Sequence, residues 1–119
     1  MDNNDLTGTI PDSYANLSNL RAFSVQSNNL NGELPSFFGS LQDLETINLF
    51  NNQFVGGIPS DLGNLQLLEN MFLHFNDFEG TMPEEICQLR NGNLKQLTAD
   101  CLPGGLVQCP QPECCTACF

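Results

Sequence analysis

The sequence predicts a repeat solenoid of the α/β class, built from about four units of 24 residues. Asn, Gly and Pro recur at this spacing in four similar segments, residues 4–11, 28–35, 52–59 and 76–83. Seven apolar positions per unit recur with the same offset, and in the second unit they are Leu30, Leu34, Phe38, Leu41, Leu44, Ile47 and Leu49. A period of about 20 to 50 residues is the signature of stacked structural repeats.

The apolar pattern excludes one long helix or one long strand. The spacings within a unit run 4, 4, 3, 3, 3, 2 and 5 residues, which neither a period of about 3.6 nor a period of about 2 sustains. The pattern continues through the last unit after a two-residue insertion near residues 91–93. Because one unit cannot cover its own apolar face, the units are expected to stack on one another.

Each unit is expected to contain a short strand. The segments 20–25, 44–49, 68–73 and 94–99 alternate apolar and polar residues near their ends, as a strand that covers a core on one face does. An Asn stands where the chain turns away from a strand and leaves backbone groups inside, and an amide side chain can both donate and accept there. We therefore predict an internal ladder of four side chains, Asn4, Asn28, Asn52 and Asn76.

The rest of each unit is expected to bend and then form a short helical turn. Gly56 and its equivalents suit a backbone conformation or a close approach that a Cβ would obstruct. Pro59 and its equivalents are expected to open the helical turn, because the first turn of a helix does not need the N–H that Pro lacks.

The charge of the chain excludes one class of partner. Fourteen acidic residues stand against three Lys and Arg residues, and the formal net charge is −11 at pH 7. Proteins that bind nucleic acid need clusters of Lys and Arg for the phosphate backbone, so nucleic acid is not an expected partner. No apolar run approaches the ~20 residues that cross a bilayer, so no membrane insertion is expected.

The cysteines lie in the last third of the chain, at Cys87, Cys101, Cys109, Cys114, Cys115 and Cys118. An even, clustered set predicts a disulfide framework and an oxidising compartment, with about fifteen pairings open. Zinc bound by the last four thiolates is the alternative, but their spacing lacks a paired C-x2-C knuckle and leaves two cysteines over. We expect disulfides that seal the C-terminal end, no metal, and a secreted or cell-surface protein.

The units read L-x-x-L-x-L-x-x-N-x-L-x-G-x-I-P-x-x-L-G-x-L, which resembles the plant-type leucine-rich repeat. The resemblance covers about residues 3–100, and the tail resembles the cysteine-rich ends of leucine-rich repeat proteins of unicellular algae. We therefore divide the chain into a solenoid at residues 1–100 and a cysteine-rich cap at residues 101–119. The family implies a right-handed superhelix with a parallel concave sheet, a second short strand from the G-x-I-P segment, and short helical or 3-10 turns on the convex side.

The sequence departs from the family pattern at its N-terminal end, where no cap precedes the first unit. Leu6, Ile10, Tyr14 and Leu17 would then form an open apolar end, which terminal repeats normally cover. Either further repeats precede Met1, or the isolated chain self-associates through this end. The first residues also lack the basic and apolar regions of a signal peptide, so the export signal is expected upstream or removed.

No constellation for catalysis or for a cofactor is visible. The single histidine, His74, has no Ser or Cys beside it in its strand that could act as a nucleophile, so we interpret it as a surface contact residue. Glu84 and Glu85 follow a Pro at the opening of a helical turn, where acidic residues complement the helix dipole. The chain is therefore predicted to be non-catalytic and to hold no cofactor.

A binding surface is expected on the concave sheet. Most outward residues of its strands are polar, but Phe50, Phe72 and Phe75 are not explained by the apolar template. Strands about 4.8 Å apart would bring these rings and His74 into one patch, and exposed aromatic clusters with a polar border mark contact sites. The predicted ligand-binding residues are Phe50, Phe72, His74, Phe75, Asn48 and Asn70. The alternative is that one or two rings only cover the neighbouring core.

The family resemblance implies a receptor-like extracellular module that binds a protein or peptide ligand. Spacer repeats within a larger receptor-like or adhesion ectodomain are the runner-up. Ice binding ranks lower, because the column of extra-strand residues Thr7, Asn31, Val55 and Glu79 is not a flat array of Thr. Asn16 begins the one N-glycosylation sequon, residues 16–18, where a glycan and a chance match both stay open.

Overall fold

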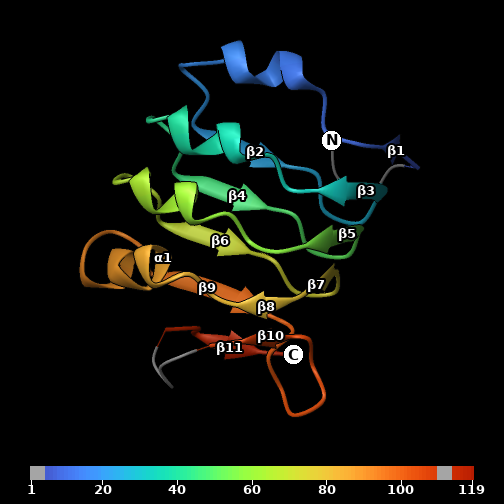
Figure 1. Ribbon diagram of the computed structural model, residues 1–119. Helices are drawn as coiled ribbons and strands as arrows, with labels where there is room; N and C mark the ends of the chain where they lie inside the picture. Colours follow the sequence, from blue (N-terminus) through green and yellow to red (C-terminus); the bar gives the residue numbers. More distant parts are fainter. Residues whose placement is uncertain (1–4, 110–113) are drawn as a thin grey trace.

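Residues 5–109 and 114–119 are described by the computed structural model, in which the turns of the chain stack as a solenoid (Figure 1). The main sheet is parallel and has the order β11-β9-β6-β4-β2. Its strands are β2 (Ala22–Ser24), β4 (Thr46–Asn48), β6 (Asn70–Phe72), β9 (Gln96–Ala99) and β11 (Ala117–Cys118). Phe23, Ile47 and Met71 align in register, so each repeat places an apolar residue inside at the same position. The predicted parallel sheet is confirmed.

A second set of short parallel strands comes from the segment around each repeated Gly. One sheet has the order β1-β3-β5-β7, with β1 (Thr7–Gly8), β3 (Asn29–Glu33), β5 (Gln53–Gly56) and β7 (Asp77–Phe78). A pair is formed by β8 (Gly80–Thr81) and β10 (Val107–Gln108), so the cysteine-rich tail adds a strand on this side as well as on the main sheet. Gly56 has a φ of 83°, a conformation that residues with a Cβ rarely adopt.

Short helices line the side of the stack away from the second set of strands (Figure 1). They are η1 (Asp12–Asn16), η2 (Ser36–Ser40), η3 (Ser60–Asn64), α1 (Glu84–Gln88) and η4 (Leu89–Asn91). Pro59 precedes η3 with an extended ψ of 133°, and the other repeated prolines stand in the same way before their helices. Each Pro is therefore the last extended residue before the helix rather than a residue of its first turn. No helix of the described residues is long and apolar enough to cross a membrane.

Two glycines let the helices pack closely on one another. A Cβ on Gly39 would lie 2.4 Å from the Asp61 carbonyl oxygen of η3, and a Cβ on Gly63 would lie 2.4 Å from the Cβ of Glu85 in α1. Real Cβ contacts are not this short, so Gly at these positions sets the distance between successive turns. This close packing lets successive helices stack on one another while the strands of the same turns pair in the sheet.

The core runs through the middle of the stack. All seven apolar template positions in each of the second, third and fourth units are buried. In the first unit only Ile10, Phe23 and Val25 are buried, whereas Leu17 is 44% exposed. Side chains of that unit cover one face of the next turn, and no turn within the described residues covers their other face. The predicted apolar positions therefore form the core, and the first unit leaves its end open.

Candidate functional site

Rings gather at the C-terminal ends of the concave strands. The His74 ring stacks between Phe50, at a centroid distance of 5.0 Å, and Phe119, at 4.0 Å. The Phe75 ring meets His74 and Phe119 edge-on, at 5.0 and 5.5 Å. Phe75 is 53% exposed and Phe119 is 42% exposed, while Phe50 and His74 are half-buried. We call Phe50, His74, Phe75 and Phe119 the aromatic patch.

The other predicted binding residues lie on the same sheet but do not all join the patch. Phe72 is half-buried on β6 and aligns with Asn48 and Thr98, and none of the ring contacts found among residues 5–109 and 114–119 involves it. Asn48 accepts a 3.4 Å hydrogen bond from the Phe50 N–H, and the Asn70 amide donates to the Thr46 hydroxyl at 3.4 Å. These polar side chains therefore form a half-buried border beside the rings.

His74 is held by a hydrogen bond as well as by stacking. Its Nδ1 lies 2.7 Å from the Thr98 hydroxyl. Burial lowers the pKa of His74 below its ordinary value, and the nearby Asp100 carboxylate partly opposes that shift. Thr98 is only 7% exposed, so its hydroxyl positions the imidazole but is not accessible as a nucleophile. The arrangement holds a neutral ring in place in a contact surface.

Phe75 adopts a backbone conformation that is unusual for a bulky residue. Its φ is 59°, in the left-handed region, which costs about 1–2 kcal/mol for residues with a Cβ. Ser27 and Asn51 occupy the same place in the earlier units and also have positive φ. Asn tolerates this conformation better than Phe, since its short polar side chain can hydrogen-bond locally. The repeat therefore explains the backbone at this position but gives no structural reason for an exposed Phe.

Asp100 ends the hydrogen-bond ladder beside the patch. One turn earlier, backbone carbonyls of His74 and Phe75 accept from the N–H groups of Asn51 and Asn52. After the last full unit, the Asp100 carboxylate takes this role and accepts from the Phe75 and Asn76 N–H groups at 2.9 and 3.0 Å. A side-chain anion thus replaces the carbonyls of a missing turn and holds the strained Phe75 backbone.

Sequence reasoning missed Phe119, Thr98 and Asp100 as parts of this site. Phe119 reaches the patch because β11 extends the main sheet and because its neighbour Cys118 is bonded to Cys101. Its backbone N–H donates to the Ala99 carbonyl at 3.0 Å. The tail carries no repeat, so only a known disulfide pairing would have brought Phe119 to this place.

The repeated asparagines line the inside of the turns. The Oδ1 of Asn28 accepts from the Leu6 N–H at 3.1 Å. The Oδ1 atoms of Asn52 and Asn76 accept in the same way from the Leu30 N–H at 3.0 Å and the Phe54 N–H at 3.1 Å. Their amide groups donate to carbonyl oxygens at the ends of the strands. Asn4 lies outside the described residues. These side chains are occupied by the backbone and are not available to a ligand.

The six cysteines form three disulfides, Cys87–Cys114, Cys101–Cys118 and Cys109–Cys115. The first bond ties the tail to α1, and the second ties β11 to the end of β9. Sulfur atoms of Cys101, Cys109 and Cys118 lie within 4.8 Å of one another, but each is already bonded to another sulfur. A zinc site needs thiolates, so this arrangement favours a covalent cap over a metal centre.

A family model described as Leucine Rich Repeat matches residues 19–41 and 43–65. The chain belongs to the leucine-rich repeat family. Solved structures agree with this assignment. The plant peptide hormone receptor RGFR1, in complex with RGF2, is 32% identical with a TM-score of 0.79, over 83% of this chain and 16% of that chain. The leucine-rich repeat ectodomain of the receptor kinase SOBIR1 from Arabidopsis thaliana is 30% identical with a TM-score of 0.77, over 83% and 53%.

A plant ice-binding protein shares the leucine-rich repeat fold. It is 24% identical with a TM-score of 0.73, over 92% of this chain and 33% of that chain. A search of curated proteins gives no match. The chain spans 16% of the RGFR1 chain and 53% of the SOBIR1 chain, less than two thirds of either.

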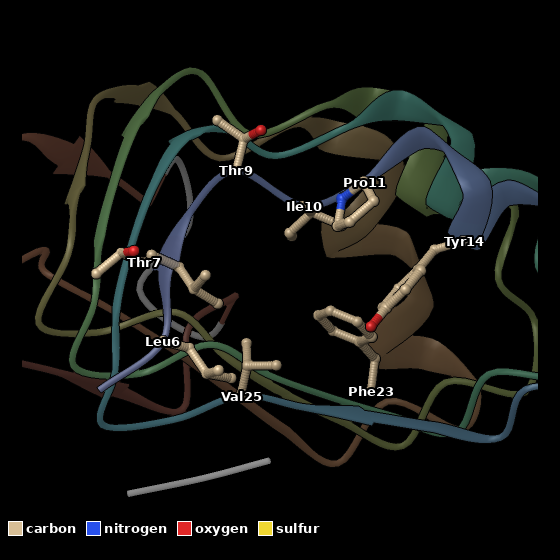
Figure 2. A pocket seen from close by; sticks show the side chains of 9 residues that line it. Leu6, Thr7, Thr9, Ile10, Pro11, Tyr14, Phe23 and Val25 are labelled. Carbon is tan, nitrogen blue, oxygen red and sulfur yellow. The ribbon is translucent and has the colours of Figure 1, made fainter. Parts of the chain in front are cut away.

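The N-terminal end of this leucine-rich repeat stack is open. Figure 2 shows apolar side chains that point into the space inside the first turn, among them Leu6, Ile10, Tyr14, Phe23 and Val25. They line a pocket of about 170 Å³. Within residues 5–109 and 114–119, the strands β1 and β2 each pair on one side only, β1 with β3 and β2 with β4. This end therefore combines apolar surface with two free strand edges.

The glycosylation candidate Asn16 is the last residue of η1. Its side chain is exposed, as are Leu17 and Ser18 of the same sequon. The position is accessible to a glycosyl transferase, and a glycan here would stand beside the open end.

Proposed function

We propose that this chain is a non-catalytic recognition module that binds a protein or peptide ligand through its concave face. The observation that carries the proposal is the aromatic patch, in which Phe75 and Phe119 are about half exposed although the core does not need them. The RGFR1 structure, which holds RGF2, supports a peptide as the ligand of a similar solenoid. The binding residues are the patch together with its border, Phe72, Asn48 and Asn70.

The disulfides support an extracellular location. Bonds of this kind persist in oxidising compartments, and the SOBIR1 relative is the ectodomain of a receptor kinase. We place this module in a secreted or cell-surface protein. The alternative is that these are spacer repeats of a larger receptor-like or adhesion ectodomain, and then the concave face would bind no ligand.

The test is selection from a random dodecapeptide library displayed on phage, panned on the folded, oxidised protein. Enriched peptides are synthesised and titrated against the wild type and against a double variant, Phe75→Asn with Phe119→Ser. The matched control is Leu67→Ser, which removes a similarly exposed apolar side chain (46% exposed) outside the patch. We expect the double variant to lose at least about tenfold in affinity, or about 1.4 kcal/mol, and the control to bind as the wild type does.

Two results would overturn the proposal. Peptides that bind the double variant as tightly as the wild type would place the contact elsewhere. Failure to enrich any peptide would favour the spacer alternative. Thermal unfolding of each variant shows whether a loss of binding is only a loss of fold.

We also propose that the isolated chain pairs with a second copy through the open N-terminal end. The C-terminal end is covered by the disulfide-bonded tail, so stacking head to tail is blocked and two free ends can meet only head to head, in a closed dimer. Sedimentation velocity at micromolar concentration should show a dimer for the wild type and a monomer for Leu17→Glu. The control Leu106→Glu, at a 57% exposed site in the tail, should stay dimeric. A monomeric wild type contradicts this proposal.

A further inference from the structure

We propose that the ligand is a cationic peptide that places an Arg or Lys side chain against the exposed rings of Phe75 and Phe119. This inference rests on the proposed function, because it names the chemistry of the ligand for the same concave face. It is carried by the charge balance of the chain, by the exposure of the two rings and by the carboxylates next to them.

The chain has almost no positive charge to offer a ligand. Its formal net charge is −11, and the three cationic side chains are each engaged within the molecule. Arg21 forms a 2.9 Å ion pair with Glu45. Arg90 donates to the carbonyls of Leu94 and Lys95 at 2.7 and 3.0 Å, and the Lys95 ammonium donates to a carbonyl at 3.3 Å. The field around the protein is therefore negative and attracts a cationic partner while it repels an acidic one.

The patch offers the kind of surface on which a cation can lie. The faces of aromatic rings carry partial negative charge, and an Arg guanidinium stacks on them as well as being drawn by their quadrupole. Phe75 meets Phe119 edge-on at 5.5 Å, so the two exposed rings present differently oriented surfaces to the solvent. The imidazole of His74 is stacked between two rings, and burial lowers its pKa, which disfavours its positively charged form.

One carboxylate contacts the Phe75 backbone, and two more acidic residues follow Phe75 closely in the sequence. The half-buried Asp100 carboxylate accepts a hydrogen bond from the Phe75 N–H. Asp77 is exposed and follows Phe75 by two residues. Glu79 is exposed on the same segment. A cation on the rings would therefore lie in the field of nearby carboxylates, whereas a carboxylate of a ligand would be repelled. An uncharged apolar ligand would gain nothing from these charges.

The experiment uses the synthetic peptides selected on the oxidised protein. Each peptide is compared with an analogue in which its Arg residues are replaced by citrulline, which keeps the shape and removes the charge. We expect the citrulline analogues to bind at least tenfold more weakly, and the affinity of the Arg peptides to fall as NaCl rises from about 0.1 to about 1 M, where the screening length shortens from about 10 to about 3 Å.

Two charge variants locate the effect. Asp77→Asn and Asp12→Asn change the net charge equally at exposed sites, but Asp77 follows Phe75 by two residues whereas Asp12 lies in η1 of the first unit. We expect Asp77→Asn to weaken the Arg peptides several-fold and Asp12→Asn to leave them unchanged. Peptides that lose affinity with the patch double variant but bind equally well as citrulline analogues would overturn the cationic ligand and leave the binding module standing. Peptides whose affinity does not change in the patch double variant would overturn both the cationic ligand and the proposed binding function.

Discussion

Replacement of Asn52 by Ala removes a buried side chain that satisfies three backbone groups in two successive turns. Its Oδ1 accepts from the Leu30 N–H at 3.0 Å, and its Nδ2 donates to the carbonyls of Val25 at 2.9 Å and Leu49 at 3.1 Å. Asn52 is only 9% exposed, so water reaches these groups poorly after the side chain is cut back. The variant therefore leaves the Leu30 N–H without its partner, whereas the Val25 and Leu49 carbonyls lose one of two hydrogen bonds and still accept from Asn28 at 2.9 Å and Asn76 at 2.8 Å.

The expected loss follows from the number of these groups. A buried donor without a partner costs about 1–3 kcal/mol and each of the two other lost hydrogen bonds about 0.5–1.5 kcal/mol, so the total is about 2–6 kcal/mol. A domain of this length has a free energy of unfolding of about 6–18 kcal/mol, at about 0.05–0.15 kcal/mol per residue. We therefore expect Asn52→Ala to remove about a third of the stability and to lower the Tm by more than about 10 °C.

Urea unfolding of the oxidised protein measures the loss, and amide hydrogen exchange locates it at the Leu30 N–H. The matched control is Asn64→Ala at the exposed end of η3, which should change the free energy of unfolding by less than about 0.5 kcal/mol. A loss of less than about 1 kcal/mol for Asn52→Ala, with unchanged exchange at Leu30, would refute the ladder as a source of stability.

Three further predictions concern the helical side, the patch and the cap. Gly63→Ala should lower the free energy of unfolding by about 1–3 kcal/mol, because its Cβ would lie 2.4 Å from a Cβ of α1. Gly57→Ala, which has open space around it, should be neutral or stabilising by up to about 1 kcal/mol, and urea unfolding compares the two variants. Because burial lowers the pKa of His74, protonation favours the unfolded chain, so stability should fall as pH drops below about 6.5. This fall should be shallower in His74→Gln. Curves of Tm against pH that run parallel for the two proteins would contradict a role of His74 in the pH dependence. Replacing both Cys87 and Cys114 by Ser opens a 27-residue loop and should cost about 3–4 kcal/mol in thermal unfolding, and an unchanged Tm would show that the cap does not support the solenoid.

The repeat made the solenoid predictable from the sequence. A position such as Leu41 is apolar in every unit because the turns above and below need the same side chain there, and that shared need appears as a 24-residue period. The same logic anticipated the exposure of Leu17, since no turn of the described residues packs on the outer face of the first unit. Each of these features depends on contacts between neighbouring units, which the sequence repeats.

The cap was predictable only as a disulfide framework. The pairing of Cys87 with Cys114 and of Cys101 with Cys118 depends on how a unique tail folds back on the last turn, and no period describes that path. Phe119 was missed for the same reason. Asp100 could have been anticipated by asking which side chain satisfies the last ladder N–H groups after the turns end.

The repeat also separates residues that the fold needs from residues that it does not. At the place of Phe75 the earlier units carry Ser27 and Asn51, and all three adopt the same left-handed backbone. The fold therefore requires the conformation but not the ring, and of the three residues Phe is the bulkiest one to hold there. A strained, exposed ring that contacts only the rings of His74 and Phe119 among the described residues has no structural role equal to its cost. Replacing Phe75 by Asn, the residue that Asn51 provides at the same place one unit earlier, should therefore raise stability while it removes binding. A variant that lost both stability and binding would show that the ring is part of the fold.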